Sequence, residues 1–147
     1  MAALIIGCGT WDRGDDAAGL LAVRLLRERG VDAREHTGDG LALIQAWQGA
    51  AEVILIDAVL TGSAAGTISR WDGSAPVRTD TVRASSHAFG VAEAVQLARA
   101  LGKLPPRFLM YGIEACNFRL GTAVSSEVAA AARALADRLS ARPHGHS

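Results

Sequence analysis

A strand, a glycine-rich loop and a helix follow one another in residues 2–26, which read AALIIGCGTWDRGDDAAGLLAVRLL. The apolar run Ala2–Ile6 ends at Gly7, which is typical of a buried parallel strand. A polar loop then reaches Gly14. Beyond it, apolar residues at the spacing i, i+3, i+4 and i+7 predict a helix with one buried face: Ala18, Leu21, Ala22 and Leu25. Gly30 is the expected stop of this helix.

The same alternation continues along the chain. Further strands are expected at Val31–Thr37, Glu52–Asp57, Thr67–Trp71 and Arg107–Ile113, and further helices at Leu41–Gln48, at about His87–Leu101 and after a cap at Ser125 or Ser126. The third of these strands alternates polar and apolar residues, so it is expected to be an edge or antiparallel strand. The fold class predicted is a three-layer α/β sandwich with a mainly parallel sheet. No repeat or linker is visible, so residues 1–141 are expected to be a single domain, with a frayed tail at residues 142–147.

The composition is that of an ordinary globular protein. Of the 147 residues, 50% are apolar and 20% are charged, which excludes wholesale disorder. Fifteen basic residues offset fifteen acidic ones, so no nucleic-acid partner is expected. No apolar run approaches the roughly 20 residues that span a bilayer, and the start of the chain lacks the features of a signal peptide. With only two cysteines, a soluble cytoplasmic monomer without a membrane partner is expected.

Ligand sites in such a sheet lie at the carboxyl ends of the strands. This rule selects three places: the loop after Gly7, Asp57, and the loop after Ile113. The strand from Thr67 leads to a fourth place, the segment Ser85–His87. In the first loop, Asp15 or Asp16 is expected to cap the helix, which leaves the other carboxylate available. Asp57 is expected at the end of its strand, at the mouth of the sheet, where it either turns the chain or belongs to a site.

A metal site is one interpretation of these residues. His87 stands at the expected start of a helix, where the helix dipole keeps an imidazole neutral, although a polar residue near a cap is the simpler interpretation. Asp16, Asp57 and His87 can converge at one edge of the sheet. Two carboxylates and one imidazole can hold a divalent metal, such as nickel, zinc or manganese, and leave positions open. Their spacing is not that of a short metal-binding motif.

Three other chemistries have weaker support. The turn Gly7–Gly9 is similar to a dinucleotide-binding turn, but Asp12 occupies the third glycine position and the nearby carboxylates would repel a pyrophosphate. The serines Ser85–Ser86 lie in no Gly-x-Ser-x-Gly elbow. Cys116 has no pattern around it that supports a nucleophilic pair with histidine. Cys8 is expected to be a small buried residue.

Four short segments form a longer pattern when they are taken in order. They are Gly7-x-Gly9-x-x-x-Arg13-Gly14-Asp15-Asp16-x-x-Gly19, then Ile56-Asp57-Ala58-Val59 with Gly62 and Gly66, then Ser85-Ser86-His87, then Tyr111-Gly112-Ile113-Glu114 with Gly121 and Ser125-Ser126-Glu127-Val128. In order and approximate spacing, the chain resembles the hydrogenase maturation endopeptidases, which trim the C-terminus of the large subunit of nickel–iron hydrogenases. The resemblance extends over nearly the whole chain, and the length suits the family.

The resemblance implies a twisted, mostly parallel five-stranded sheet between helices. It implies an endopeptidase that acts on the large-subunit precursor, with Asp16, Asp57 and His87 as the residues that contact metal. In this family the nickel belongs to the substrate, and cleavage follows a basic residue near the last cysteine pair. The metal would polarise the scissile carbonyl, and Asp16 or Asp57 would handle the protons of an attacking water. The choice between the two carboxylates stays open, and other divalent metals can occupy such a site.

The chain departs from the family's common pattern at three places in its first third. Thr10 stands where Asn is common, and Ala17 stands where Gly is common. The family often has an acidic residue before the glycines that follow the second strand, and this chain has Thr37 there. These changes leave the three metal-contact residues intact. Two other functions stay open: a non-catalytic nickel-binding or metallochaperone module, and a small enzyme that binds a phosphorylated ligand at the first loop. If Trp11 is exposed on that loop, it can contact a partner.

Overall fold

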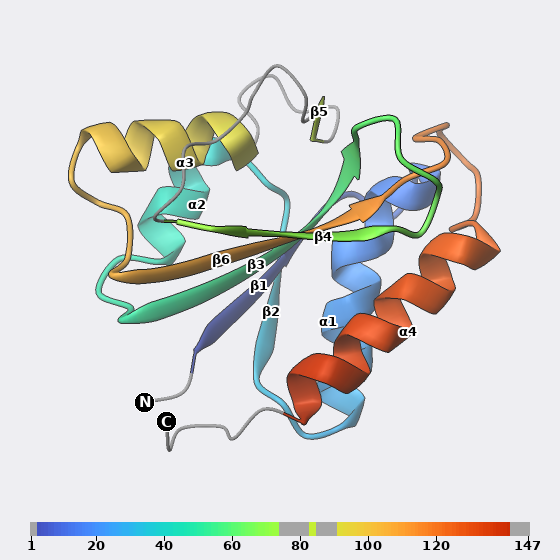
Figure 1. Ribbon diagram of the computed structural model, residues 1–147, viewed down its shortest axis with the longest axis horizontal. Helices are drawn as coiled ribbons and strands as arrows, with labels where there is room; N and C mark the ends of the chain where they lie inside the picture. Colours follow the sequence, from blue (N-terminus) through green and yellow to red (C-terminus); the bar gives the residue numbers. More distant parts are fainter. Residues whose placement is uncertain (1–2, 74–82, 85–90, 142–147) are drawn as a thin grey trace.

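The computed structural model describes residues 3–73, 83–84 and 91–141, and their strands form one sheet (Figure 1). Five strands lie in the order β2-β1-β3-β6-β4. Their bounds are β1 Leu4–Cys8, β2 Ala33–His36, β3 Glu52–Leu60, β4 Ile68–Asp72 and β6 Arg107–Glu114. The first three and β6 are parallel, and β4 pairs with β6 in the antiparallel sense at the edge of the sheet. The two-residue β5, Arg83–Ala84, pairs with the end of β3.

Two helices cover each face of this sheet (Figure 1). The helices α1, Ala18–Glu28, and α4, Ser126–Ser140, pack together on one face, and α2, Gly40–Ala46, and α3, Val91–Ala100, pack together on the other. Side chains of the central strand β3 alternate between the two cores. Ile54 and Ile56 belong to the core under α1 and α4, whereas Val53 and Leu55 belong to the core under α2 and α3. The predicted three-layer sandwich with a mostly parallel sheet is confirmed.

Several element boundaries differ from the sequence prediction. The strand expected to end at Asp57 continues to Leu60, because residues 58–60 are also apolar and β6 pairs with β3 through Val59. Asp57 therefore lies inside a strand and is fully buried, so its expected place at the mouth of the sheet is wrong. The first helix begins as a 3₁₀ helix at Gly14–Ala17 and becomes α-helical at Ala18.

Two glycines hold the start of α1 against the sheet. A Cβ added at Gly19 would lie 2.6 Å from the Cys8 carbonyl oxygen, and one added at Gly9 would overlap the Asp16 carbonyl oxygen. Both neighbours are backbone atoms that no rotamer change can move aside. The 3₁₀ helix can therefore lie directly on the carboxyl end of β1 only because these two positions have no side chain.

Some expectations fall outside the described residues. They include His87, the serines Ser85–Ser86 and the expected tail at residues 142–147. The longest described helix, α4, has 15 residues, and none of the described helices has the length and apolar character needed to cross a membrane.

Candidate functional site

Asp16 and Asp57 form a buried acid pair at the carboxyl end of β1. Both residues are 0% exposed. Asp57 Oδ1 accepts a hydrogen bond of 2.9 Å from the N–H of Ala58, and its Oδ2 has no hydrogen-bond partner among the described residues. Burial raises the pKa of the Asp57 carboxyl well above its usual range, and the charge of Asp16 raises this pKa further, against the opposing effect of the Ala58 N–H. The structure thus brings two of the three predicted site residues together.

Cys8 lies beside this acid pair at the end of β1. Its side chain is 1% exposed. Burial raises the pKa of the Cys8 thiol well above its usual range, and the charges of Asp57 and Asp16 add to the effect. Cys8 therefore stays a neutral thiol, which makes it a poor nucleophile and a poor metal ligand. The prediction that it is a small buried residue is confirmed.

Asp15, the neighbour of Asp16, faces a different part of the molecule. Its Oδ1 accepts a hydrogen bond of 2.6 Å from the N–H of Ser125. Its Oδ2 accepts from the N–H of Cys116 at 2.7 Å, from the N–H of Asn117 at 3.3 Å and from the hydroxyl of Ser125 at 3.0 Å. The Asp15 N–H also donates to the Asn117 carbonyl oxygen at 3.1 Å. Asp15 therefore fastens the 3₁₀ helix to the loop between β6 and α4.

The predicted helix caps are wrong in their detail. Neither Asp15 nor Asp16 caps a helix, because Arg13 and Ala17 occupy the two N-cap positions without a side-chain hydrogen bond. Ser125 does occupy the N-cap position of α4, but its hydroxyl makes no cap bond there and donates to Asp15 instead. Two adjacent acids were the only sequence signal for this arrangement, and they do not reveal which partner each one has.

Glu114, at the end of β6, has a structural role that the sequence did not reveal. It is 3% exposed. Its carboxylate accepts hydrogen bonds from the N–H and hydroxyl of Thr61, at 2.8 and 2.6 Å, and from the N–H of Gly62 at 3.3 Å. These bonds hold the loop that follows β3. Glu114 is therefore occupied and does not add a third carboxylate to the acid pair.

The acid pair has the chemistry of a partial metal site. A buried carboxylate oxygen without a donor is unfavourable unless a proton or a cation satisfies it, and Asp57 Oδ2 is such an atom. Oxygen ligands of this kind suit divalent cations. Across residues 3–73, 83–84 and 91–141, no three His, Cys, Asp or Glu side chains gather closely enough to hold a metal ion. The predicted third ligand, His87, lies outside these ranges.

The comparisons with known proteins agree on one group. A family model described as hydrogenase maturation protease matches residues 36–141. The hydrogenase expression/formation protein HupM of Azotobacter chroococcum is 32% identical over 117 residues, which cover 76% of this chain and 56% of that protein. The chain thus spans little more than half the length of the curated relatives that it matches.

Solved structures give the same picture for the fold. The [NiFe] hydrogenase maturation protease HybD from Thermococcus kodakarensis has a TM-score of 0.76 and 29% identity, with 95% of this chain and 99% of that chain covered. The hydrogenase maturating endopeptidase HybD from E. coli has a TM-score of 0.75 at 19% identity, with 95% and 90% covered, and supports the fold alone.

Proposed function

This chain belongs to the hydrogenase maturation protease family, and on that premise we propose that it is an endopeptidase of nickel–iron hydrogenase maturation. Its proposed substrate is the precursor of a hydrogenase large subunit, from which it removes a C-terminal extension. The observation that carries the proposal is the buried acid pair, Asp16 and Asp57, which the sequence pattern marked and which lies next to the carboxyl end of β1.

The electrostatics of the acid pair support a role in sensing the substrate's nickel. The two carboxylates lie close enough for the charge of Asp16 to raise the pKa of Asp57, so two negative charges without a cation are unfavourable there. A precursor that carries nickel brings positive charge to the pair, whereas an unloaded precursor does not. The pair therefore favours the loaded precursor, and His87 is the proposed third contact with the nickel.

Hydrolysis of the peptide bond needs only a water molecule and one of the two carboxylates for its proton transfers. A water oxygen bonds to the scissile carbonyl carbon while Asp16 or Asp57, in its ionised form, accepts a proton from that water. The C–N bond then breaks, and the same carboxyl returns the proton to the leaving amine. One carboxylate within reach of the peptide is sufficient for this proton transfer, and the other stays with the cation.

The decisive experiment measures the intact mass of a cognate large-subunit precursor after incubation with this protein, with and without nickel in the precursor. We expect the loaded form alone to lose one defined C-terminal peptide. Asp16→Asn, Asp57→Asn and His87→Ala should each abolish the loss. Asp12→Asn, an exposed residue of the same loop, is the matched control and should process normally.

The same experiment tests the main competing function. A non-catalytic nickel-binding or metallochaperone module on this fold would bind nickel or the precursor without changing the precursor's mass. An unchanged mass of the loaded precursor, in a mixture where the two proteins are shown to associate, would replace the endopeptidase by that module.

A further inference from the structure

A hollow of about 300 Å³ opens at the carboxyl ends of β1 and β2. We call it the Trp11 pocket, and its walls include Gly9, Trp11, Leu20, Glu35 and His36. Gly9 belongs both to this pocket and to the acid pair's surroundings, because a Cβ at Gly9 would overlap the Asp16 carbonyl oxygen. Gly9 therefore joins one wall of the pocket to the backbone of Asp16.

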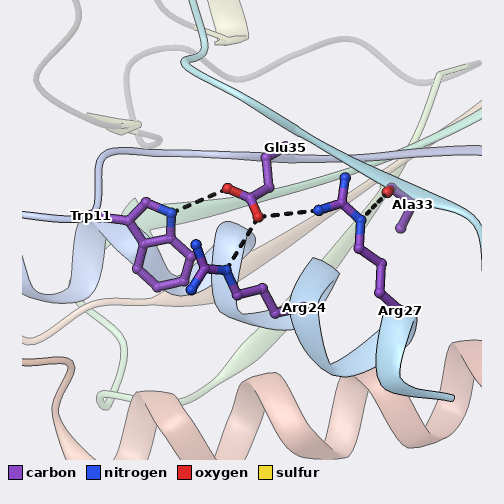
Figure 2. A network of polar contacts seen from close by, with 5 residues as sticks. All are labelled: Trp11, Arg24, Arg27, Ala33 and Glu35. Atoms are coloured by element: carbon purple, nitrogen blue, oxygen red, sulfur yellow. Dashed lines mark hydrogen bonds and ion pairs between the residues drawn. The ribbon is translucent and has the colours of Figure 1, made fainter.

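Trp11 is held rigidly although it is 38% exposed. Its indole Nε1–H donates to Glu35 Oε1 at 3.1 Å, and the guanidinium carbon of Arg24 lies 4.1 Å from the ring centre (Figure 2). Glu35 Oε2 in turn accepts from Arg24 Nε at 3.2 Å and from Arg27 Nη1 at 3.3 Å. Arg27 is itself anchored by a bond of 2.7 Å from its Nε to the Ala33 carbonyl oxygen. The loop, α1 and β2 thus fix one aromatic ring together.

The folded core does not account for this arrangement. Trp11 belongs to neither of the two hydrophobic cores formed by the described residues. An exposed aromatic ring that is already ordered loses little conformational entropy when a partner packs on it, and such rings supply much of the energy of binding surfaces. The network therefore prepares Trp11 for contact with another molecule.

The walls of the pocket define what it can accept. Both carboxylate oxygens of Glu35 are already used by Trp11, Arg24 and Arg27, so the pocket offers no free anion to a basic side chain. The two arginines leave a net positive charge around Glu35, which also disfavours a cation. Trp11 and Leu20 supply apolar surface. An apolar group is the occupant that fits.

We propose that the Trp11 pocket is a subsite for an apolar side chain of the substrate polypeptide next to the scissile bond. The proposal rests on the proposed endopeptidase function. The volume of the Trp11 pocket lies at the lower end of the ~300–1,000 Å³ typical of ligand pockets, which suits one large side chain better than a cofactor. Trp11 is the wall that touches this side chain, and Glu35 positions Trp11. Because β2 is one of the two outermost strands among the described residues, an extended peptide can approach the pocket without displacing a described strand.

Steady-state processing of the nickel-loaded precursor tests this subsite. We expect Trp11→Ala to raise KM at least tenfold with kcat within twofold of wild type. Trp11→Phe, which keeps an aromatic ring, and Glu35→Gln, which weakens the whole network that holds Trp11, should raise KM less. Leu101→Ala removes another exposed apolar side chain, just beyond α3, and should change neither constant. Circular dichroism confirms that each variant is folded.

Substitutions in the precursor identify the side chain that occupies the Trp11 pocket. Apolar residues beside the scissile bond are replaced by Ser, one at a time, and one replacement should raise the KM of wild type tenfold while leaving that of Trp11→Ala unchanged. An unchanged KM for folded Trp11→Ala and Trp11→Phe, or additive effects for every replacement, overturns the subsite.

The measurements distinguish an error in the proposed subsite from an error in the proposed endopeptidase function. If wild type cleaves and the Trp11 variants have its KM, only the subsite is wrong. If wild type cleaves nothing, the function is wrong, and calorimetric titration with the precursor then decides the pocket. Tenfold weaker binding by Trp11→Ala supports a binding pocket, and equal binding refutes it.

Discussion

The Asp15 carboxylate accepts two hydrogen bonds from Ser125, one from its N–H and one from its hydroxyl, although 110 residues separate them. These two hydrogen bonds join the 3₁₀ helix that carries Asp16 to the start of α4. The relationship assigns the two adjacent acids different tasks. Asp15 holds the helix in place, and Asp16 faces the interior beside Asp57.

Replacement of Asp15 tests this division. Asp15→Asn places an amide NH₂ against backbone N–H groups, so we expect the free energy of unfolding to fall by about 2–4 kcal/mol. Ser125→Ala removes one of the four bonds and should lower it by about 1 kcal/mol. Urea unfolding measures both values. An Asp15→Asn variant as stable as wild type would contradict the role given to Asp15.

Asp57 is expected to reduce stability while serving the site. The folded-state pKa of Asp57 is raised above its unfolded value, so the protein loses stability as pH rises from about 4 through the folded-state pKa. Asp57→Asn removes that loss and should raise Tm at pH 7, by about 3 °C for each kcal/mol gained.

The sign of this effect can be checked by comparing the two proteins across pH. The difference in Tm should be small near pH 4, where wild-type Asp57 is protonated in the folded state and about half protonated in the unfolded state, and should grow toward pH 7. A larger difference at pH 4 than at pH 7 would reverse the electrostatic argument. At pH 7, Ni²⁺ should raise the Tm of wild type more than that of Asp57→Asn, because a cation that binds the folded state stabilises it.

Gly19 is expected to tolerate no side chain. In Gly19→Ala the new Cβ would lie 2.6 Å from the Cys8 carbonyl oxygen, so α1 must shift away from β1 and the acid pair must separate. We expect a loss of about 3 kcal/mol of unfolding free energy and of precursor processing. Gly30→Ala is the control, because its Cβ meets nothing within 4 Å and its positive φ alone is strained, at about 1–2 kcal/mol. Equal free energies of unfolding for Gly19→Ala and Gly30→Ala would show that crowding at Gly19 is unimportant.

The two cysteines should react differently with thiol reagents. Cys116 is exposed, whereas Cys8 is buried and the pKa of its thiol is raised by burial and by Asp57 and Asp16. Alkylation of the native protein should therefore modify one thiol, identified as Cys116 by peptide mass, and denaturation should expose the second. Rapid modification of Cys8 in the native protein would mean that the region of the acid pair opens readily.

Much of the fold could be predicted because it depends on local periodicity. The apolar run at Val53–Ile56 and the helical spacing from Ala18 to Leu25 each indicated the right element. The extent of β3 was missed, since its last residues are strand because they pair with β6 and β5. The rule that parallel strands bind ligands at their carboxyl ends, together with the family resemblance, predicted Asp16, Asp57 and His87 as site residues, and the roles of Asp15 and Glu114 were missed.

The sequence by itself determined the α/β class and the edge position of β4, because these follow from spacing within one segment, and it predicted Asp16 and Asp57 as site residues. Tertiary structure alone decided that Asp15 binds Ser125, that Glu114 binds Thr61 and that Trp11 is fixed by Glu35. Each of these bonds joins residues between 24 and 110 positions apart. A carboxylate has the same appearance in the sequence whichever donor it meets, and only the packing of the helices on the sheet brings a particular donor to it.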